Sequence, residues 1–428
     1  MRVQMAFGKS GLNLDLPDGF DYRILEAKGA KALADSNGAL DEALAHPIDS
    51  PSLGELARGR RSAAISVCDI TRPAPNRQTL PPILKILGEA GIPAAETKIL
   101  IATGLHRAAT AEEIDEIVGP EIARRYTVLN HDARNLDEHR FLGESRRGTP
   151  AYIDRRYLDA DLHITLGFIE PHLMLGFSGG RKLIVPGLAA QETIKVIHSP
   201  KFMREPMATE GSIDENPLHR ELCEIAGMAR HDFMLDVALA RDRSIAAVFA
   251  GHALAAHRQG VRFVSATLLE QLDEPVDAVI TSAAGYPLDL TFYQAIKGIT
   301  AAHHILKPGG KILLLAECPE GAGAPEFRHM LQTFGSYTGF LNAIRETPVI
   351  VDQWQLEKLA LVANKHEVLF HVPGLGAEYR THFGPNVVDS PEAAVAALIG
   401  SLRPGAKVAV IPEGPYVLAR VAEAVGAA

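Results

Sequence analysis

The densest group of residues capable of chemistry lies between Gly167 and Pro200. At its centre is Ser178-Gly179-Gly180-Arg181-Lys182, which combines the accessible backbone N–H groups of glycine with two basic side chains. Such a loop suits a phosphate or another anionic ligand. It has the spacing of neither a Walker A loop nor a G-x-G-x-x-G dinucleotide loop, so it lends no support to ATP or ordinary NAD binding. For this loop alone, the alternative is a tight turn with solvated basic residues.

Three histidines stand in or near comparable loops. His106 lies within 103–107, His172 closes 167–172, and His198 follows a helical pattern at 189–197. An imidazole changes its charge close to neutral pH, so each could transfer protons or bind a metal. Each could also simply hydrogen-bond within its loop or face a helix C-terminus. In the same way, Asp69 and Arg72 could form a local ion pair or cap the next helix.

The elements that must position these groups are three short apolar runs rich in β-branched residues. The runs at 63–67, 98–102 and 162–166 predict buried strands, and a loop that contains candidate residues follows each run at once. In parallel α/β sheets, ligands bind beyond the carboxyl ends of the strands. We therefore expect Asp69, His106 and His172 at one edge of one sheet. Their common location favours a shared site over a separate structural role for each residue.

A second α/β unit begins near Pro275. The pattern predicts a strand at 276–281, a helix at 290–306, a turn at 307–310 and a strand at 311–315. Further strands are predicted at 359–362, 368–371 and 408–411. Because 428 residues exceed what one hydrophobic core usually supports, the expected fold class is α/β, with two domains and largely parallel sheets.

The composition excludes several classes of protein. The chain carries 43 Lys and Arg against 52 Asp and Glu, a net charge of −9, and no concentrated basic stripe, which argues against a nucleic-acid partner. Its three cysteines, Cys68, Cys223 and Cys318, lack C-x-x-C spacing, so a disulfide framework or thiolate zinc site is not expected. There is neither a secretory signal pattern nor a run of about 18 apolar residues. We expect a cytoplasmic protein without a membrane partner.

The succession of motifs closely resembles the nickel-pincer lactate racemase family, from about Asp69 to Trp354. The motifs that carry the resemblance are Asp69-x-Thr71-Arg72-Pro73, Thr103-Gly104-x-His106-Arg107, Pro171-His172, Gly176-x-Ser178-Gly179-Gly180-x-Lys182-x-Ile184-x-Pro186-Gly187, His198-Ser199, Tyr293-Gln294-Ala295-x-Lys297-Gly298 and Gln353-Trp354. No common fold signature produces this order of residues. Only three of the 17 histidines fall in these motifs, and the others, including His303, His304 and His382, are assigned to structural or surface roles.

The resemblance implies a cofactor and a role for each matched residue. Lys182 would carry a nickel-pincer nucleotide, a pyridinium bisthiocarboxylic acid mononucleotide nickel complex, through a covalent thioamide. The cofactor-binding loop would include Ser178, Gly179 and Gly180, and His198 would be the single protein ligand of nickel. The family's catalytic and substrate-binding roles would fall to His106 and His172 as paired acid and base, to Arg72, Gln294 and Lys297 around the substrate, to Asp69 as a supporting residue, and to Tyr293 and Trp354 in the pocket wall.

The reaction implied is racemisation or epimerisation of 2-hydroxy acids. The C–H bond beside the hydroxyl is too weakly acidic for an ordinary side-chain base, so removing hydride to the cofactor and returning it through a 2-keto acid is the alternative. Arg72 and Lys297 would bind the carboxylate. A nickel ion that takes sulfur from its cofactor needs few protein ligands, which fits a chain poor in cysteine.

The resemblance also implies an organisation and partners. An N-terminal cofactor domain would cover 1–270 plus 391–428, a smaller inserted Rossmann-like domain would cover 275–390, and the active site would lie in the interdomain cleft. The expected partners are a small 2-hydroxycarboxylate, the cofactor-biosynthesis enzymes and further copies of the chain in a homo-oligomer.

Three alternatives stand beside this interpretation. The histidine loops could hold zinc in a hydrolase, which requires three or more protein ligands. The turn at 306–311 has a superficial likeness to nucleotide-binding methyltransferases. A catalytically silent cofactor-binding homologue is the non-enzymatic alternative.

Overall fold

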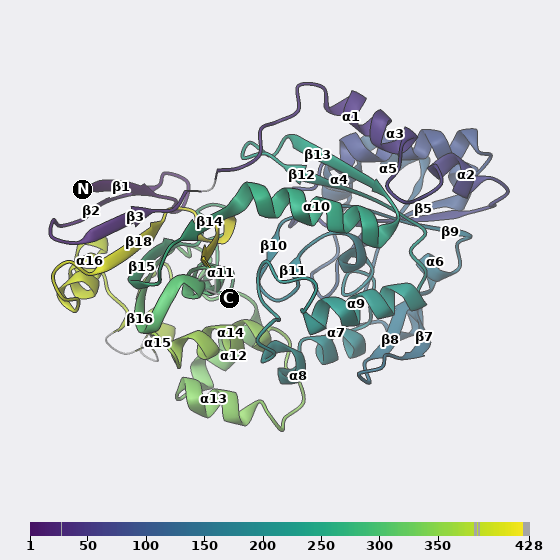
Figure 1. The fold of residues 1–428 in the computed structure, drawn as a ribbon. Coiled ribbons are helices and arrows are strands. Elements are labelled where there is room, and N and C mark those ends of the chain that lie inside the picture. Colours follow the sequence, from purple (N-terminus) through teal and green to yellow (C-terminus); the bar gives the residue numbers. More distant parts are fainter. Residues whose placement is uncertain (27, 381–382, 384–385, 423–428) are drawn as a thin grey trace, which may run out of the picture. The chain divides into compact units, whose positions relative to one another are not determined.

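The computed structural model describes residues 1–26, 28–380, 383 and 386–422, and the chain divides into two units (Figure 1). One unit, here called the Lys182 unit, consists of Gly29–Ile197 and Glu205–Thr267. The other, the Trp354 unit, consists of Met1–Lys28, His198–Arg204 and Leu268–Ala428. The boundaries cross the chain several times, so neither unit is one continuous segment.

The Lys182 unit is built on a six-stranded sheet in the order β13-β12-β9-β4-β5-β6. Its strands are β4 (Ala63–Cys68), β5 (Thr97–Ala102), β6 (Thr127–Asn130), β9 (Leu162–Phe168), β12 (Phe233–Leu239) and β13 (Ile245–Gly251). All neighbours are parallel except β12 and β13. Every residue of β4 and β9 is buried, as expected for strands covered on both faces.

Helices of this unit cover the sheet with apolar faces. Within α3 (Asn76–Glu89), the buried side chains recur at helical spacing as Leu80, Ile83, Leu84 and Leu87. The other helices are α1 (Ser36–Ala45), α2 (Leu53–Ala57), α4 (Ala111–Val118), α5 (Pro120–Arg125), α6 (Arg155–Leu158), α7 (Gln191–Ile197), α9 (Pro217–Met228) and α10 (Ala253–Leu268). Two small antiparallel pairs lie outside the main sheet, β7 (His139–Glu144) with β8 (Pro150–Asp154) and β10 (Pro171–His172) with β11 (Gly176–Phe177).

The Trp354 unit has a five-stranded parallel sheet in the order β17-β16-β15-β18-β3. Its strands are β3 (Asp21–Ile24), β15 (Val276–Ser282), β16 (Leu306–Leu315), β17 (Glu367–His371) and β18 (Lys407–Ile411). The purple β3 and yellow β18 in Figure 1 are paired neighbours from opposite ends of the chain. Its helices are α8 (Pro200–Met203), α11 (Phe292–Ala302), α12 (Pro325–Thr333), α13 (Tyr337–Ala343), α14 (Gln353–Ala363), α15 (Ala377–Arg380) and α16 (Pro391–Gly400), and its small strand pairs are β1 (Arg2–Met5) with β2 (Leu12–Asp15) and β14 (Leu269–Leu272) with β19 (Leu418–Val421).

The fold class predicted from the sequence is confirmed, as are the strands at 63–67, 98–102, 162–166, 276–281, 311–315, 368–371 and 408–411. The strand predicted at 359–362 is wrong, because these residues lie in α14. There Leu356, Leu359 and Ala360 are buried at spacings of three and four residues, so the apolar run follows the helical period. The turn predicted at 307–310 lies within β16, where Gly309 takes a positive φ of 73°.

The structure places 391–422 differently from the expected domain boundaries. Within this segment, β18 hydrogen-bonds to β15 on one side and to β3 on the other, and α16 packs against β16 and β17. A strand paired along both edges cannot leave its sheet without exposing backbone groups. The C-terminal segment therefore completes the Trp354 unit instead of returning to the first domain, and residues 1–28 join the same unit.

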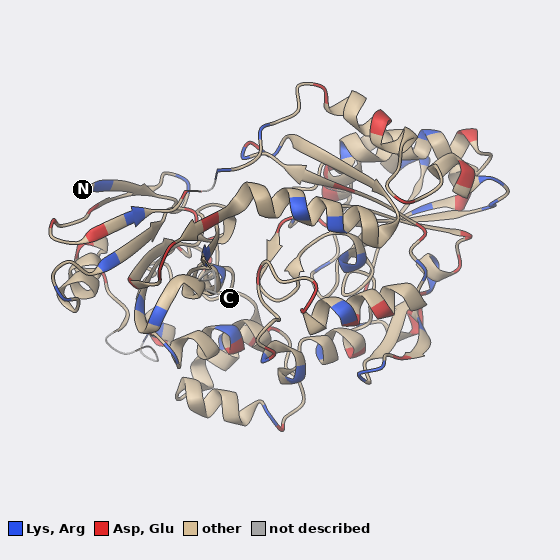
Figure 2. Ribbon diagram, viewed as in Figure 1, with Lys and Arg blue, Asp and Glu red and all other residues tan. Residues whose placement is uncertain are grey.

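In the part of the chain that is described, no helix is both long and apolar enough to traverse a bilayer. Basic and acidic residues are interspersed along the helices and loops of each unit (Figure 2).

We expect Ile411→Ala to destabilise the Trp354 unit selectively. Ile411 is fully buried in β18 opposite Thr281, and removing such a side chain costs about 2–5 kcal/mol of unfolding free energy. Amide hydrogen exchange should accelerate in β15 and β3. The matched variant Ile65→Ala in β4 should accelerate exchange in β5 and β9 instead, and the same response to both variants would contradict the assignment of 391–422.

Candidate active site

Asp69 and His106 form the first pair at the carboxyl edge of the Lys182 unit's sheet. Asp69 follows β4 directly, and His106 lies four residues beyond β5. Asp69 Oδ2 is 2.6 Å from His106 Nδ1, while Asp69 Oδ1 accepts a 2.7 Å hydrogen bond from the Thr71 hydroxyl. Burial alone would raise the pKa of Asp69, but the hydrogen bond and charge of His106 and the charge of Arg72 lower it. An ionised Asp69 assigns the proton to Nδ1 of His106, leaving Nε2 as the acceptor.

The loop that carries His106 is tied to the loop that carries Lys182. Gly104, at a φ of +55°, donates its N–H to the Gly187 carbonyl at 3.1 Å. Behind it, the Thr103 hydroxyl donates to the His131 carbonyl at 2.7 Å, and the rings of His131 and His139 meet through their Nε2 atoms at 2.9 Å. Burial lowers the pKa of His131 to about 3. The two histidines and Thr103 form a buried hydrogen-bonded group next to this loop, which no sequence motif indicated.

His172 sits on the β10–β11 hairpin, opposite Gly176. Its Nδ1 accepts long hydrogen bonds of 3.4 Å from the N–H groups of Met174 and Leu175. Since both partners are donors, they assign the neutral ring's proton to Nε2, the reverse of His106. The two histidines therefore present opposite hydrogen-bonding roles through their Nε2 atoms, one as acceptor and one as donor.

The glycine-rich loop packs against a buried carboxyl of β12. Gly180 N donates to Asp236 Oδ2 at 2.7 Å, and a Cβ added to Gly179, whose φ is +83°, would come within 2.2 Å of the same oxygen. Burial raises the pKa of Asp236 to about 7. The Ser178 hydroxyl donates to the Phe168 carbonyl and accepts from Glu170 N, which fixes the loop to the end of β9. These glycines thus permit a close approach to Asp236 that the sequence did not reveal.

Arg181 and Lys182 have different roles, although they are adjacent. The buried Arg181 guanidinium donates to backbone carbonyls of the loop and of the residues before it, those of Leu175, Phe177, Ser178 and Gly179. It therefore binds the loop internally instead of offering its charge to a ligand. The interpretation of both basic side chains as anion binders does not hold for Arg181.

The environment of Lys182 suits a nucleophilic amine. Burial and the nearby Arg72 charge lower the pKa of Lys182 to about 8, against the opposing effects of Cys68, Glu170 and Asp69. A lysine desolvated beside another cation is neutral more often at physiological pH and reacts more readily. The structure thus brings Asp69, Arg72, His106 and Lys182 together at one edge of the sheet.

The second group of candidates lies in the Trp354 unit. The Thr291 side chain caps α11, whose less buried face carries Tyr293, Gln294 and Lys297. Trp354 Nε1, near the start of α14, donates to the Tyr293 hydroxyl at 3.0 Å, and the Trp354 ring lies 4.4 Å from the His198 ring. Among the described residues, Gln294 Oε1 is a buried atom without a hydrogen-bond partner, as expected of a group that awaits a ligand.

The donor set fits a metal that brings most of its own ligands. Over the described ranges, the structure has no group of three or more His, Cys, Asp or Glu side chains that could hold a metal ion. A zinc hydrolase requires such a group, so that alternative gains no support. A cofactor that brings its own metal ligands requires no such group. His382 lies outside the described residues.

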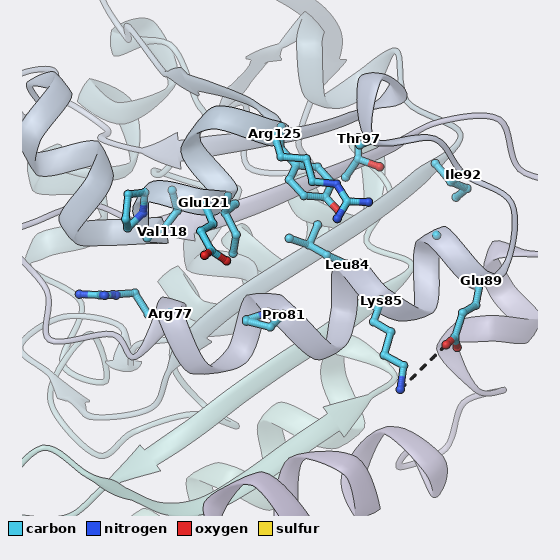
Figure 3. Close-up of a pocket in the computed structure, with 16 residues that line it drawn as sticks. Arg77, Pro81, Leu84, Lys85, Glu89, Ile92, Thr97, Val118, Glu121 and Arg125 are labelled. Carbon is cyan, nitrogen blue, oxygen red and sulfur yellow. Dashed lines mark ion pairs between the residues drawn. The ribbon is translucent and has the colours of Figure 1, made fainter.

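The Lys182 unit contains a cavity of about 790 Å³ (Figure 3). It is bounded by α3 and α5 and by Thr97 at the start of β5, whereas His106 follows the end of that strand. Lys85 points toward Glu89, with which it forms an ion pair at 3.9 Å. The cavity therefore occupies the opposite end of the strand from the candidate residues.

Comparison with protein families assigns both parts of the chain. The model of the lactate racemase N-terminal domain matches residues 7–211, and that of the lactate racemase C-terminal domain matches residues 272–419. The chain belongs to the lactate racemase family. It is accordingly an enzyme of the isomerase class. The second match runs beyond residue 391, in agreement with the placement of β18 in the Trp354 unit.

Individual relatives agree with this assignment. The chain is 35% identical over 424 residues to the lactate racemase of Thermoanaerobacterium thermosaccharolyticum, covering 98% of this chain and 99% of that protein. It is 34% identical over 385 residues to the lactate racemase of Lactiplantibacillus plantarum, covering 89% and 90%. The structure of the Thermoanaerobacterium apoprotein superimposes with a TM-score of 0.91 at 33% identity, covering 98% of this chain and 100% of that one. A Thermotoga maritima protein of 17% identity, with a TM-score of 0.66 and coverage of 90% and 98%, shares the fold.

The lowered pKa of Lys182 predicts a distinctive labelling profile. At pH 7 a pKa of about 8 leaves roughly a tenth of the amine neutral, against roughly one part in three thousand for an ordinary lysine. Acetic anhydride labelling, followed by peptide mass spectrometry, should show Lys182 reacting with a midpoint near pH 8. Arg72→Gln removes the neighbouring cation and should move this midpoint upward, whereas Arg77→Gln, on α3, should not. Equal midpoints in all three proteins would contradict the electrostatic explanation.

Proposed function

We propose that this enzyme racemises or epimerises 2-hydroxy acids, with lactate as the prototype substrate, and that a nickel-pincer nucleotide is attached covalently to Lys182. The observation that carries the proposal is the cluster of Asp69, His106, Arg72 and Lys182 at one sheet edge, with a lysine of lowered pKa. Its counterpart in the Trp354 unit contains an imidazole at His198 for the nickel and an unsatisfied amide oxygen at Gln294.

The chain's own residues would bind the substrate and move its hydroxyl proton. Asp69 holds Nδ1 of His106, so that Nε2 can take the proton from the 2-hydroxyl group. His172, the other member of the pair, would return a proton to the keto oxygen from its imidazolium form when the 2-keto acid is reduced, and in its neutral form it would act as the base for the opposite enantiomer. Arg72 and Lys297 would bind the carboxylate, Gln294 would hydrogen-bond the substrate, and Tyr293 and Trp354 would shape the pocket wall.

The cofactor would supply what these residues cannot. When bound, the nickel-pincer nucleotide would supply reversible hydride acceptance at C2 of the substrate, chemistry that no side chain of this chain provides. Lys182 would hold it through the thioamide, within the loop of Ser178, Gly179 and Gly180, and His198 would ligate the nickel. Because such a cofactor must be synthesised and installed, cofactor-biosynthesis enzymes are the expected partners, and we propose that the enzyme works in the cytoplasm.

The roles of the histidines and the lysine predict separable defects. In protein co-expressed with the cofactor-making enzymes, His106→Ala and His172→Ala should each reduce racemisation by about 10²–10⁴-fold, because each removes a proton-transfer group. Both should retain the cofactor adduct in intact-mass spectra. Lys182→Ala should lose the adduct itself. Chiral separation of a panel of 2-hydroxy acids measures the activity and identifies the substrate.

The controls distinguish this proposal from its alternatives. Arg107→Gln changes a loop side chain that pairs with Glu113 at the start of α4, and it should retain most activity. A wild-type protein without adduct and nickel would contradict the proposed cofactor. Hydrolytic activity that appears when zinc alone is added to the purified chain would instead favour a hydrolase.

A further inference from the structure

The short segment His198–Arg204 belongs to the Trp354 unit, although the chain on both sides of it lies in the Lys182 unit. The segment contains α8, a single turn that starts after Ser199 with Pro200 in its first position. A helix of four residues has too few internal hydrogen bonds to be stable alone. The position of His198 at its start must therefore depend on what the segment packs against.

Polar contacts attach this segment to α14 and α13. Arg204 Nε lies 2.6 Å from Glu357 Oε1, and Arg204 Nη2 donates to the Leu341 carbonyl at 2.6 Å. Lys358 Nζ donates to the Met203 carbonyl at 3.1 Å. Between these contacts, Phe202 and Met203 are buried. The segment is thus held at its C-terminal end by two adjacent charged residues of one helix.

The opposite end of the segment meets the same face of α14. The His198 ring lies 4.4 Å from the Trp354 ring at an interplanar angle of 43°. Trp354 precedes Glu357 by three residues and Lys358 by four, so the three side chains share one face of the helix. The Trp354 indole is itself oriented by its hydrogen bond to the Tyr293 hydroxyl. Displacing α8 along this face would move the imidazole off the indole.

We propose that Arg204 and Glu357 are positioning residues for His198, which they hold against Trp354 by clamping α8 onto α14. The proposal rests on the proposed function only in taking His198 as the protein ligand of nickel. Residues outside a metal's first ligand shell that orient a ligand typically affect metal affinity by 10–100-fold.

The chemistry of the pair explains why it can fix a geometry. The Glu357 side chain is fully buried, and burial raises its pKa against the opposing hydrogen bond and charge of Arg204. A buried carboxylate requires its partner, so the pair resists separation. The planar guanidinium also donates in two directions, to Glu357 and to the Leu341 carbonyl, which a lysine ammonium cannot reproduce in the same geometry.

The first test uses the protein without cofactor. Trp354 is the only tryptophan of the chain, so its fluorescence reports the contact with His198 directly. In Arg204→Ala and Glu357→Gln, the emission should shift to longer wavelength and acrylamide quenching should rise about twofold or more. Amide hydrogen exchange of 198–204 should accelerate. Glu357→Gln keeps the side-chain shape and serves as the variant that preserves folding.

A matched control separates positioning from general stability. Arg156 and Asp154 form an ion pair with side-chain exposures of 24% and 0%, the same values as Arg204 and Glu357. Arg156 also pairs with Glu138 at 2.9 Å, so Arg156→Ala in the Lys182 unit removes at least as much interaction as the clamp variants do. It should nevertheless leave the Trp354 emission and the exchange of 198–204 unchanged. Unchanged signals in the Arg204 and Glu357 variants as well would overturn the proposal.

The second test uses the protein co-expressed with the cofactor-making enzymes. Glu357→Gln and Arg204→Ala should keep the Lys182 adduct in the intact-mass spectrum but bind nickel 10–100-fold more weakly, measured as nickel per adduct during titration with a chelator. Arg156→Ala should match the wild type in both. Wild-type nickel retention in the clamp variants would refute the positioning role. A wild-type chain without adduct would refute the proposed function, and the fluorescence test would still decide whether the clamp sets the His198–Trp354 contact.

Discussion

Asp236 accepts a hydrogen bond from Gly180 N–H beneath the loop that presents Lys182, and the geometry of that loop depends on this buried contact. Only glycine at position 179 lets the backbone come so close to the carboxyl group, and Arg181 closes the loop by donating to its carbonyls from within. Buried polar groups favour the conformation that gives them hydrogen-bond partners. Among the described residues, Asp236 Oδ1 and Arg181 Nε are buried without such a partner. The contacts that are made attach the loop of the reactive lysine to β12 and to the end of β9.

At the same edge of the sheet, the charge of Arg72 affects the pKa values of two neighbouring groups. Arg72 lowers the pKa of Lys182, and with His106 it also lowers the pKa of Asp69. A single cation thus favours a neutral amine on one neighbour and an ionised carboxylate on another. The ionised Asp69 in turn sets the tautomer of His106, while backbone N–H groups set the opposite tautomer of His172. The surroundings of the two histidines therefore make Nε2 of His106 an acceptor and Nε2 of His172 a donor.

The Trp354 unit is assembled from segments that lie far apart in the sequence. Its sheet takes strands from both ends of the chain, since β18 is paired between β15 and β3. The segment with His198 joins it through contacts with α14, after the chain has left β9 and passed through α7. The segment of His198, a candidate metal ligand, is therefore held by a residue distant in the sequence, since Arg204 and Glu357 are separated by 153 positions.

The sequence by itself determined the strands whose apolar runs are buried on both faces and, through them, the placement of Asp69 and His106 at a common edge. It also contained the ordered motifs that identify the family. Only the tertiary structure decided that Arg181 is internal, that Asp236 supports the glycine loop, that His131 and His139 lie behind Thr103, and that 391–422 completes the Trp354 unit. The contacts of Asp236, the His131–His139 pair and 391–422 involve partners distant in sequence, which local periodicity cannot encode. The carbonyl partners of Arg181 are near in sequence, but they come within reach of its guanidinium only once the loop is folded. The strand predicted at 359–362 is wrong for a different reason, because four apolar residues are too few to distinguish the period of a strand from that of a helix.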